Sequence, residues 1–226
     1  MDKDITKRLL RDAGIPIVRF LTYKKHERKN ITFEKLKQSL GVPFFVKPAN
    51  HGSSVGITKV HNEQEHSAAL ELAFSYDTKI LIEEYINGKE VECAVLGNEA
   101  PIASLCGEIV SHHEFYSYEA KYLDENGAAL SIPAHIPKHV SKKIQKLATQ
   151  VFEVLCCEGM ARVDFFVTDN KNIFINEINT IPGFTSVSMY PKLWDASGIS
   201  YAKLIDTLIE FAIRRFREEQ KLQTSS

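Results

Sequence analysis

The sequence predicts a mixed α+β fold in two parts, and three observations support this. Segments with the apolar period of a helix alternate with short apolar runs typical of strands. After Gly88, two strand-like runs follow one another across a short turn, which is typical of an antiparallel sheet. The 226 residues are enough for one large domain or two small ones. We place a boundary near residues 84–88, so that 1–86 form a small part and 87–226 a larger one.

The chain begins with a segment that predicts a short amphipathic helix, residues 3–13. Its apolar positions are Ile5, Leu9 and Leu10, with charged residues between them, and Gly14 follows as a stop signal. Apolar positions at helical spacing indicate the face that packs on a core.

The rest of the small part alternates strands and helices. The basic stretch 24–29 predicts a solvated loop, and Thr32 is a candidate N-cap for a helix that ends near Gly41. The other expected elements are strands at 15–20, 42–48, 55–60 and 80–86 and a helix at 62–74.

The larger part predicts strands first and a long helix last. Residues 111–135 are polar, aromatic and poorly periodic, and a loop of this length is usually functional or disordered. The expected elements are strands at 90–97 and 101–110, a helix at 137–155, a hairpin of 160–167 with 172–179, and a helix from 201 to about 222.

Composition limits the classes of function. The formal net charge of −1 gives no bulk electrostatic drive toward nucleic acid or membrane, so we expect neither partner. No apolar run approaches the roughly 20 residues of a membrane span, and the N-terminus does not resemble a secretory signal. The cysteines form no C-x-x-C pair and are interpreted as buried free thiols, which fits a reducing cytoplasm. These cysteines are Cys93, Cys106, Cys156 and Cys157.

The predicted hairpin carries four polar side chains that can gather on one face. Arg162 and Asp164 are two residues apart on one strand, as are Glu177 and Asn179 on the next. Two carboxylates and an amide oxygen are ligands that Mg²⁺ prefers, and an arginine beside them offers positive charge to a phosphoryl group. The alternative is an exposed polar strand face. The opposite face, expected to be core, carries Val163, Phe165, Phe174 and Ile178, with Asn176 as an exception.

Two further segments are candidate anion sites. The loop 52–56 is small, glycine-containing and hydroxyl-rich, and its backbone amides can wrap a phosphate, although it is not a Walker A loop. Lys47 ends an apolar strand, where an ammonium favours an anionic partner. The loop 182–188 can present N–H groups in the same way. The alternatives are ordinary surface turns and an edge-strand lysine.

A strand end and the long loop complete the candidate set. Glu83 and Glu84 end an apolar strand, and Glu90 follows; backbone groups there can read an adenine edge, and a carboxylate can bind ribose. The alternative is a solvated strand end. Tyrosines and a lysine in the long loop suggest a lid over substrate, or else a disordered loop. They are Tyr116, Tyr118, Lys121 and Tyr122, with Glu119 among them.

At this point the order and spacing of five motifs resemble the D-alanine–D-alanine ligases along nearly the whole chain. The implied fold is ATP-grasp, in which two subdomains clasp ATP between two antiparallel sheets. The opening MDK (1–3) also resembles the start of the family's central domain. The motifs are FFVKPANHGSSVG (44–56), LIEEYINGKE (81–90), YSYEAKY (116–122), ARVDFF (161–166) and NEINTIPGFTSVS (176–188).

The resemblance implies roles for phosphate-binding residues. Lys3 and Lys47 would contact the ATP phosphates, and Lys121 would reach the γ-phosphate. Ser53 would lie near the phosphates and the second substrate, and Tyr122 would close the lid by hydrogen bonding near Ser53. The Lys121-Tyr122 pair favours a dipeptide product over D-alanyl-D-lactate.

It also implies the rest of the site. Glu83, Glu84 and Ile86 would line the adenine pocket, with Glu90 on the ribose. One set of residues would hold two Mg²⁺ ions, which Mn²⁺ can replace. A second set would bind the second substrate and stabilise the tetrahedral intermediate. The metal ligands would be Asp164, Glu177 and Asn179, and the catalytic groups Arg162, the backbone of Gly183, and Ser188 on the carboxylate of the second D-alanine.

The resemblance implies ATP-dependent ligation of two D-alanines through an acyl phosphate, for cell-wall precursors. Family members begin with an N-terminal domain that this sequence lacks, so we expect a truncated form in which nucleotide binding survives better than ligation. Full-length members are often homodimers. Two alternatives stay open: an ATP-grasp ligase for another amino acid, and a non-catalytic nucleotide-binding remnant.

Overall fold

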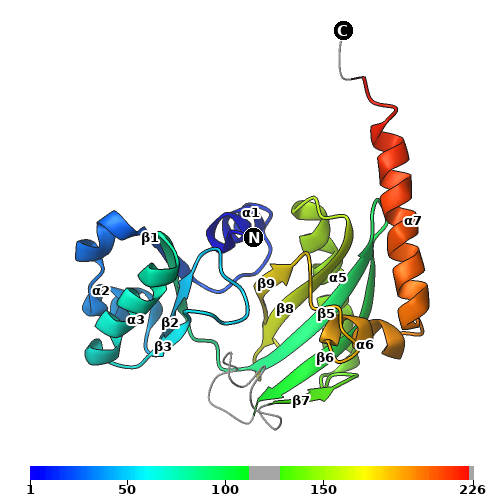
Figure 1. Ribbon diagram of the computed structural model, residues 1–226. Helices are drawn as coiled ribbons and strands as arrows, with labels where there is room; N and C mark the ends of the chain where they lie inside the picture. The colour runs from blue at the N-terminus through cyan, green and yellow to red at the C-terminus, as the bar shows by residue number, and fades with distance from the viewer. Residues whose placement is uncertain (112–127, 224–226) are drawn as a thin grey trace. The chain divides into compact units, whose positions relative to one another are not determined.

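A computed structural model describes residues 1–111 and 128–223, and the chain in it divides into two compact units (Figure 1). The first comprises Met1–Lys89, Ile109–Ala129 and Phe166–Asn176, and the second Glu90–Glu108, Leu130–Phe165 and Glu177–Ser226. Later segments therefore return to the first unit. The predicted boundary near residues 84–88 stays a prediction, and each unit is described by itself.

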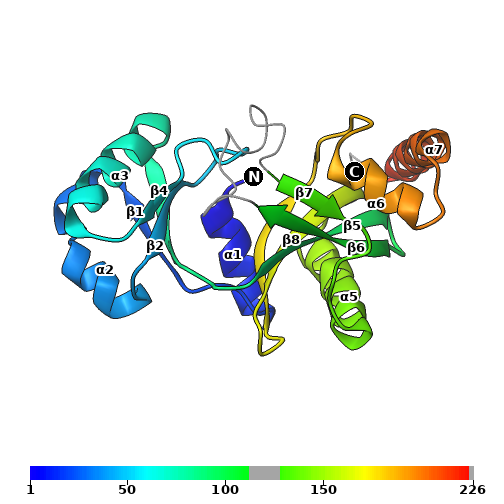
Figure 2. The same cartoon turned by 90° about the horizontal axis from the view of Figure 1, so that it is seen from below.

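The first unit is built on a four-stranded antiparallel sheet with the order β1-β4-β2-β3. Two helices, α2 and α3, lie on one face of this sheet (Figures 1 and 2). The bounds are β1 Phe20–Lys24, α2 Phe33–Leu40, β2 Phe44–Pro48, β3 Thr58–Val60, α3 Glu63–Tyr76 and β4 Lys79–Glu84.

Strand alternation separates an apolar face of this sheet from a charged one. Phe44, Val46, Ile80 and Ile82 belong to the core formed with the two helices. Because successive side chains of a strand point to opposite faces, Phe45, Lys47, Leu81 and Glu83 lie on the other face. Phe45 pairs with Glu83, and Lys47 with Leu81, in the register of β2 and β4.

The first helix, α1 Lys3–Asp12, is confirmed, but the face predicted to be buried is wrong. Ile5 and Leu9 are 54% and 47% exposed, and only Leu10 of the three apolar residues is buried. Asp4, Thr6 and Lys7 are buried instead. The reason is electrostatic: Asp4 lies 3.3 Å from the Lys79 ammonium, and Lys7 lies 3.2 Å from Glu83.

The strand predicted at 15–20 is wrong, because β1 begins only at Phe20. The residues before β1 make only an isolated bridge, between Ile17 and Ile175. Beside it, the Pro16 carbonyl accepts a hydrogen bond from the Ile175 N–H. Proline has no N–H to donate to a ladder, which disfavours a regular strand here.

Three other local predictions need adjustment. The basic stretch forms a short 3-10 helix, η1 Lys25–Asn30, rather than an irregular loop. Thr32 stands at the N-cap of α2, but its side chain makes no capping hydrogen bond. β3 is shorter than predicted, because the Val55 and Ile57 N–H groups bond back to Gly52 and Ser54 in turns.

The second unit carries most of a five-stranded sheet with the order β7-β6-β5-β8-β9. Helices α5 and α6 lie on opposite faces of it (Figure 2). Neighbouring residues of β6 show this, because the Ser141 hydroxyl of α5 donates to Cys106 whereas Gly107 lies against Leu193 of α6. The bounds are β5 Lys89–Gly97, β6 Ile102–Ser111, β7 Ala128–Ser131, α5 Lys138–Val154, β8 Gly159–Val167, β9 Ile173–Asn179, α6 Met189–Ala196 and α7 Tyr201–Glu219.

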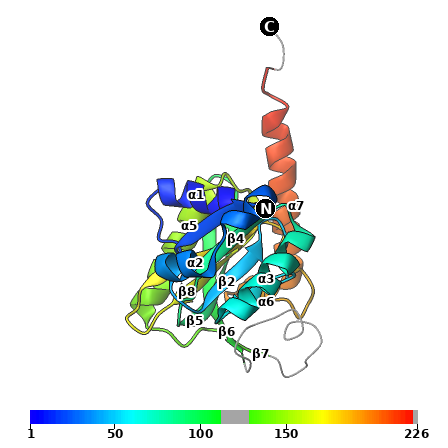
Figure 3. The same ribbon diagram turned by 90° about the vertical axis from the view of Figure 1, so that its left-hand side faces the viewer.

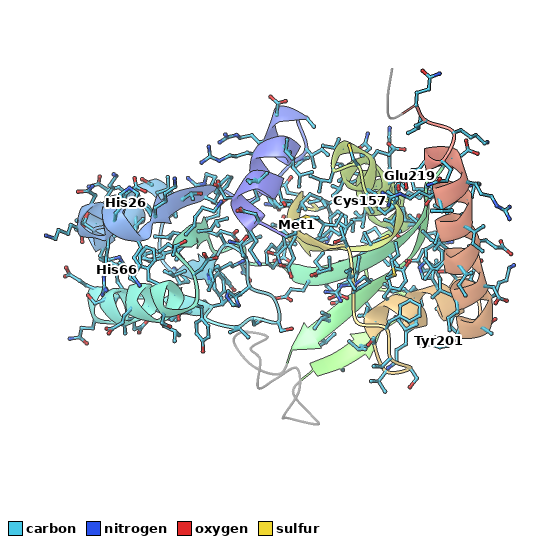
Figure 4. All side chains as sticks on the ribbon, turned by 45° about the horizontal axis from the view of Figure 1, so that its top comes forward. Met1, His26, His66, Cys157, Tyr201 and Glu219 are labelled. Atoms are coloured by element: carbon cyan, nitrogen blue, oxygen red, sulfur yellow. The ribbon has the colours of Figure 1, made fainter. Side chains whose placement is uncertain are left out.

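The long loop predicted at 111–135 is partly wrong, because β7 occupies four of its residues. The tyrosines and lysine of the predicted lid lie outside the described residues. The C-terminal helix α7 is confirmed and extends beyond the sheet of its unit (Figures 1 and 3), with Tyr201 and Glu219 marking its ends in Figure 4. In the described part of the chain, no helix is long and apolar enough to span a membrane.

The hairpin of β8 and β9 is confirmed, and Ile178 of β9 is buried as predicted, but Phe174 is not. Phe174 is only half-buried, whereas Ile173 and Ile175 on the opposite face are 4% and 1% exposed. The backbone of the segment before β1 pairs with the edge of β9 at Ile175.

All four cysteines are free thiols. Cys93 and Cys106 are buried as predicted, whereas Cys156 is exposed and Cys157 is half-buried. The chain leaves α5 before these two residues, and Cys156 has a positive φ of 50°.

A histidine, His66 of α3, is buried in the core of the first unit (Figure 4). Its ring lies 6.1 Å from that of Phe33 and 6.3 Å from that of Phe44, between ring centroids. Its Nε2 atom has no hydrogen-bond partner among the described residues. Burial lowers the pKa of His66 below 6.5, although Glu63 acts in the opposite direction.

We therefore predict that His66→Leu makes the free energy of unfolding fall less than that of the native protein as the pH is lowered. The unfolded chain binds the imidazole proton first as the pH falls, so the stability of the native protein is lost progressively below about pH 6.5 through this residue. The variant removes that loss. The difference in free energy of unfolding, variant minus native, should therefore be about 1 kcal/mol larger at pH 5.5 than at pH 8. Urea unfolding at the two pH values measures this. The matched control is His26→Leu at an exposed site, and an equal pH effect in both variants would contradict the prediction.

Candidate functional site

The charged face of the first sheet holds a buried cluster of two lysines and one glutamate. The Lys47 ammonium lies 2.6 Å from Oε2 of Glu83, and the Lys7 ammonium lies 3.2 Å from Oε1. The exposed fractions of Lys7, Lys47 and Glu83 are 2%, 7% and 2%. Lys7 also donates to the backbone carbonyl of Asn176 at 3.0 Å.

This cluster controls the ionisation of Glu83. Burial raises the pKa of the carboxyl, but Lys47 and Lys7 outweigh burial and lower the pKa of Glu83 to about 2. The group is therefore an anion held between two cations at neutral pH. Sequence reasoning missed Lys7, because a charged residue inside an amphipathic helix normally indicates the solvated face.

An aromatic pair and an ion pair lie at the end of the same strands. The rings of Phe45 and Tyr85 are 6.2 Å apart, and the Lys59 ammonium lies 4.3 Å from the Tyr85 ring centroid. The Glu84 carboxylate is held by Arg19, through the side-chain Nε at 2.6 Å and the backbone N–H at 2.7 Å. A planar base can stack on such rings, whereas the Glu84 side chain is already engaged.

The glycine loop after β2 is anchored at its base. The Lys3 ammonium donates to the carbonyl of His51, and the Lys3 N–H bonds to the carbonyl of Ala49. Asn50 donates to the Asp77 carboxylate from both its backbone and its side chain. The opening of α1 and the loop are thus tied together.

The tip of this loop has left-handed backbone at Ser53, Ser54 and Gly56, with φ of 52°, 60° and 70°. A side chain at Gly56 would have its Cβ 2.7 Å from the Tyr76 ring and 2.9 Å from Pro48. Ser53 is exposed at the tip. Successive left-handed residues expose backbone N–H groups that suit an anion.

On the second unit, Arg162 is held between two carboxylates. Its Nε and Nη2 donate to the two oxygens of Asp164 at 2.7 and 2.8 Å, and its Nε also lies 2.9 Å from Glu92. Burial lowers the pKa of Arg162, but Asp164 and Glu92 outweigh burial, and the net shift is upward. The guanidinium is therefore a permanent, oriented cation.

Glu92 was missed from the sequence, although the signal was present. It lies on β5 two residues after Glu90, so the same alternation that groups Arg162 with Asp164 places both glutamates on one face of β5. Glu90 is half-buried.

The predicted metal ligands lie around Asp164 and Arg162. The Asn179 amide nitrogen donates to Oδ2 of Asp164 at 3.0 Å, and Glu177 is close enough to raise the pKa of Arg162. No group of three or more His, Cys, Asp or Glu residues able to hold a metal occurs among the described residues. The set here has two carboxylates and one amide, so its oxygens fit Mg²⁺ if water and phosphate supply the remaining ligands.

The loop after β9 is closed by its own hydroxyls. The Ser188 hydroxyl accepts from the Thr185 N–H at 3.2 Å and lies 2.8 Å from the Thr185 hydroxyl. The Tyr201 hydroxyl donates to the Phe184 carbonyl at 2.8 Å and fixes the loop to α7. A Cβ at Gly183 would lie 2.9 Å from the Ser188 hydroxyl, so a side chain at this position would require that hydroxyl to move.

The structure thus places the predicted residues in separate groups within each unit. In the first unit Lys47 contacts Glu83, Lys3 contacts the glycine loop, and Ile86 is half-buried beyond β4. The second unit brings Arg162, Asp164, Glu177 and Asn179 together, with Gly183 beside Ser188 in the following loop. Lys121 and Tyr122 lie outside the described residues.

The glycine loop gives a direct test of backbone geometry. We predict that Gly56→Ala lowers the free energy of unfolding by about 1–3 kcal/mol, because alanine at this positive φ is strained and its Cβ meets the Tyr76 ring. Gly52→Ala is the control, because its φ is not positive and a Cβ there meets no heavy atom within 4 Å in the described chain. Urea unfolding measures both. Equal stability of the two variants would contradict this geometry.

Comparisons with known proteins agree with the predicted family. The family described as "D-ala D-ala ligase C-terminus" matches residues 9–210. A D-alanine–D-alanine ligase of Shouchella clausii is 55% identical over 225 residues, which cover 100% of this chain and 61% of the relative. This chain therefore spans about three-fifths of the length of that relative.

Solved structures show the same relationship. A D-alanine–D-alanine ligase from Coxiella burnetii has a TM-score of 0.87 and 43% identity, over 98% of this chain and 59% of that one. A D-alanine–D-alanine ligase from Bacillus anthracis, complexed with ATP, has a TM-score of 0.80 and 31% identity, over 96% of this chain and 67% of that one. The predicted α+β, ATP-grasp fold is confirmed, and the chain belongs to the family of the D-alanine–D-alanine ligase C-terminus.

Proposed function

We propose that this chain supplies the ATP-binding and catalytic part of an enzyme that joins two D-alanines into D-alanyl-D-alanine with ATP, for peptidoglycan precursors. The observation that carries the proposal is the charged face of the hairpin, where Arg162 is oriented by Asp164 and Glu92 beside Glu177 and Asn179. Such a set suits phosphoryl transfer, in which catalysis is mainly positioning and charge stabilisation.

In this proposal the first unit binds the phosphates and the base of the nucleotide. Lys47 and Lys3 contact the phosphates, together with the N–H groups of the glycine loop. Phe45 and Tyr85 offer rings on which the base stacks, with Glu83 near the end of β4 and Ile86 just beyond it. Because the Glu84 carboxylate pairs with Arg19, its contribution to the adenine pocket comes from the backbone. Glu90, which belongs to the second unit, takes the ribose hydroxyls.

The second unit holds the reacting groups. Asp164, Glu177 and Asn179 would hold Mg²⁺ ions, which neutralise phosphate charge when bound. The Arg162 guanidinium and the Gly183 N–H stabilise the tetrahedral intermediate, and Ser188 binds the carboxylate of the second D-alanine. Since the Ser188 hydroxyl already contacts Thr185, substrate binding requires it to reorient or to act as part of that pair.

The proposed reaction has two steps. The carboxylate of the first D-alanine attacks the γ-phosphate of ATP, which gives an acyl phosphate and ADP. The amine of the second D-alanine then attacks the acyl carbon, and phosphate leaves as the dipeptide forms. Phosphorylation is needed because a free carboxylate is a poor acylating agent. Lys121 and Tyr122 would act at the γ-phosphate and in lid closure.

Two observations support this proposal over the alternatives. The relatives of similar sequence are named D-alanine–D-alanine ligases, which favours D-alanine over another amino acid. The polar set of the hairpin is present and its charges are oriented, which disfavours a remnant that only binds nucleotide.

Release of phosphate from ATP tests the proposal. We predict Mg²⁺-dependent release that requires D-alanine and exceeds that with D-serine or D-lactate. The rate should be lower than that of a full-length relative, which contains a further region. Asp164→Asn should lower it by about 100-fold or more, since it removes the negative charge that orients Arg162 and replaces an anionic metal ligand with a neutral one.

The matched control is Asp169→Asn, the same change in the exposed turn of the same hairpin, which should leave the rate within about twofold. A rate of phosphate release that does not depend on D-alanine, or that is unchanged in Asp164→Asn, would contradict ligation. ATP binding without any release would favour the nucleotide-binding alternative.

A further inference from the structure

Two ammonium groups face one carboxylate in the buried cluster of the first unit. Lys7 approaches Oε1 of Glu83 from α1, and Lys47 approaches Oε2 from β2. All three side chains are more than nine-tenths buried. Burying a second lysine for one carboxylate is costly, because each ammonium loses its hydration. The excess cation therefore needs a further explanation.

The two lysines are not equivalent. Lys7 also donates to the backbone carbonyl of Asn176 at 3.0 Å, which fixes it on the far side of Glu83. The second contact of Lys47 is looser, 3.5 Å from the Asn176 side-chain oxygen. Lys47 stands next to the end of β2, the strand that leads toward the glycine loop, whereas Lys7 stands in the middle of α1. Lys47 is the lysine placed to turn toward another anion.

We propose that Lys7 is a positioning residue that keeps Glu83 charge-compensated while Lys47 turns from Glu83 to the phosphates of a bound nucleotide. This inference rests on the proposed function, and it adds a residue to which the family resemblance assigned no role. Lys7 does not touch the nucleotide. It acts through Glu83, whose charge would otherwise hold Lys47 back.

The electrostatics support this exchange. Attraction between unit charges at about 3 Å is strong in a poorly hydrated site, so a Glu83 without Lys7 would compete with phosphate for the single remaining ammonium. The charged groups that face Glu83 are Lys47 from β2 and Lys7 from α1, and both lower its pKa. Asn176 of β9 contacts both lysines and is neutral.

The first test compares ATP with adenosine, which has no phosphate to attract Lys47. Lys7→Met should weaken ATP binding about tenfold or more in calorimetric titrations, and should change adenosine binding less than about twofold. The control is Arg11→Met, an exposed cation on the same helix, which should leave both affinities unchanged. A merely structural role of Lys7 would lower both affinities together, and that result would overturn the inference.

Failure of the inference and of the proposed function can be told apart. Unaltered ATP affinity in Lys7→Met, with normal binding by the native chain, overturns only the inference. If the native chain does not bind ATP, that result contradicts the proposed function. It also contradicts the part of this inference in which Lys47 turns to the nucleotide.

A second test needs no nucleotide and measures whether the two lysines replace one another. At pH 7, Lys7→Met and Lys47→Met should each raise the unfolding equilibrium constant moderately, because one ammonium remains. The double variant should raise it at least about tenfold beyond the product of the single effects, because a buried carboxylate is left bare. Additive effects would overturn the inference. Adding Glu83→Gln should restore folding if the double variant does not fold.

The pH dependence provides an independent readout. The folded-state pKa of Glu83 lies at about 2, below the ordinary 4.5. A depressed carboxyl pKa stabilises the fold above pH 4.5 and loses this contribution as the pH falls toward 2. The penalty of the double variant should therefore shrink between pH 7 and pH 4, as its uncompensated Glu83 takes up a proton. A penalty that is independent of pH would count against a charge-based role.

Discussion

Glu83 is a buried anion whose two lysine partners come from distant parts of the chain, and much of the first unit depends on it. Lys7 brings in α1, Lys47 belongs to β2, and both contact Asn176 of β9. The same pairing explains why α1 turns its polar face inward and leaves Ile5 and Leu9 exposed. A charge pair of this kind costs desolvation, so it is retained more readily where a ligand uses the charge than where packing alone matters.

The second unit also pairs a largely buried charged group with two groups of opposite charge, but there the central group is a cation. Arg162 is oriented by Asp164 and Glu92, as Glu83 is oriented by its lysines. In each unit strand alternation separates an apolar face from a charged one: Phe44 and Val46 alternate with Phe45 and Lys47 in β2, and Val163 and Phe165 with Arg162 and Asp164 in β8. The fold therefore supports both stability and chemistry with the same strands.

The strands and most helices could be predicted from the sequence because their signals are local. Period-2 alternation predicts the hairpin and places Arg162 and Asp164 on one strand face. The same alternation in β5 places Glu92 on one face with Glu90. Lys7 could not be found in this way, because the partner that buries it is far away in the sequence. Alternation also misplaced Phe174, which is only half-buried although Ile178 on the same face is buried. The family resemblance supplied the roles of individual residues, which spacing alone left open.

Calorimetric titration of the chain with ATP in Mg²⁺ measures whether this fold binds the nucleotide, as the proposed ligase requires. We expect saturable binding at one site, abolished or strongly weakened by Lys47→Met and retained in Lys192→Met, a change outside the charged face of the first sheet. A chain that folds but shows no heat of binding, or binds equally well without Lys47, would contradict the account.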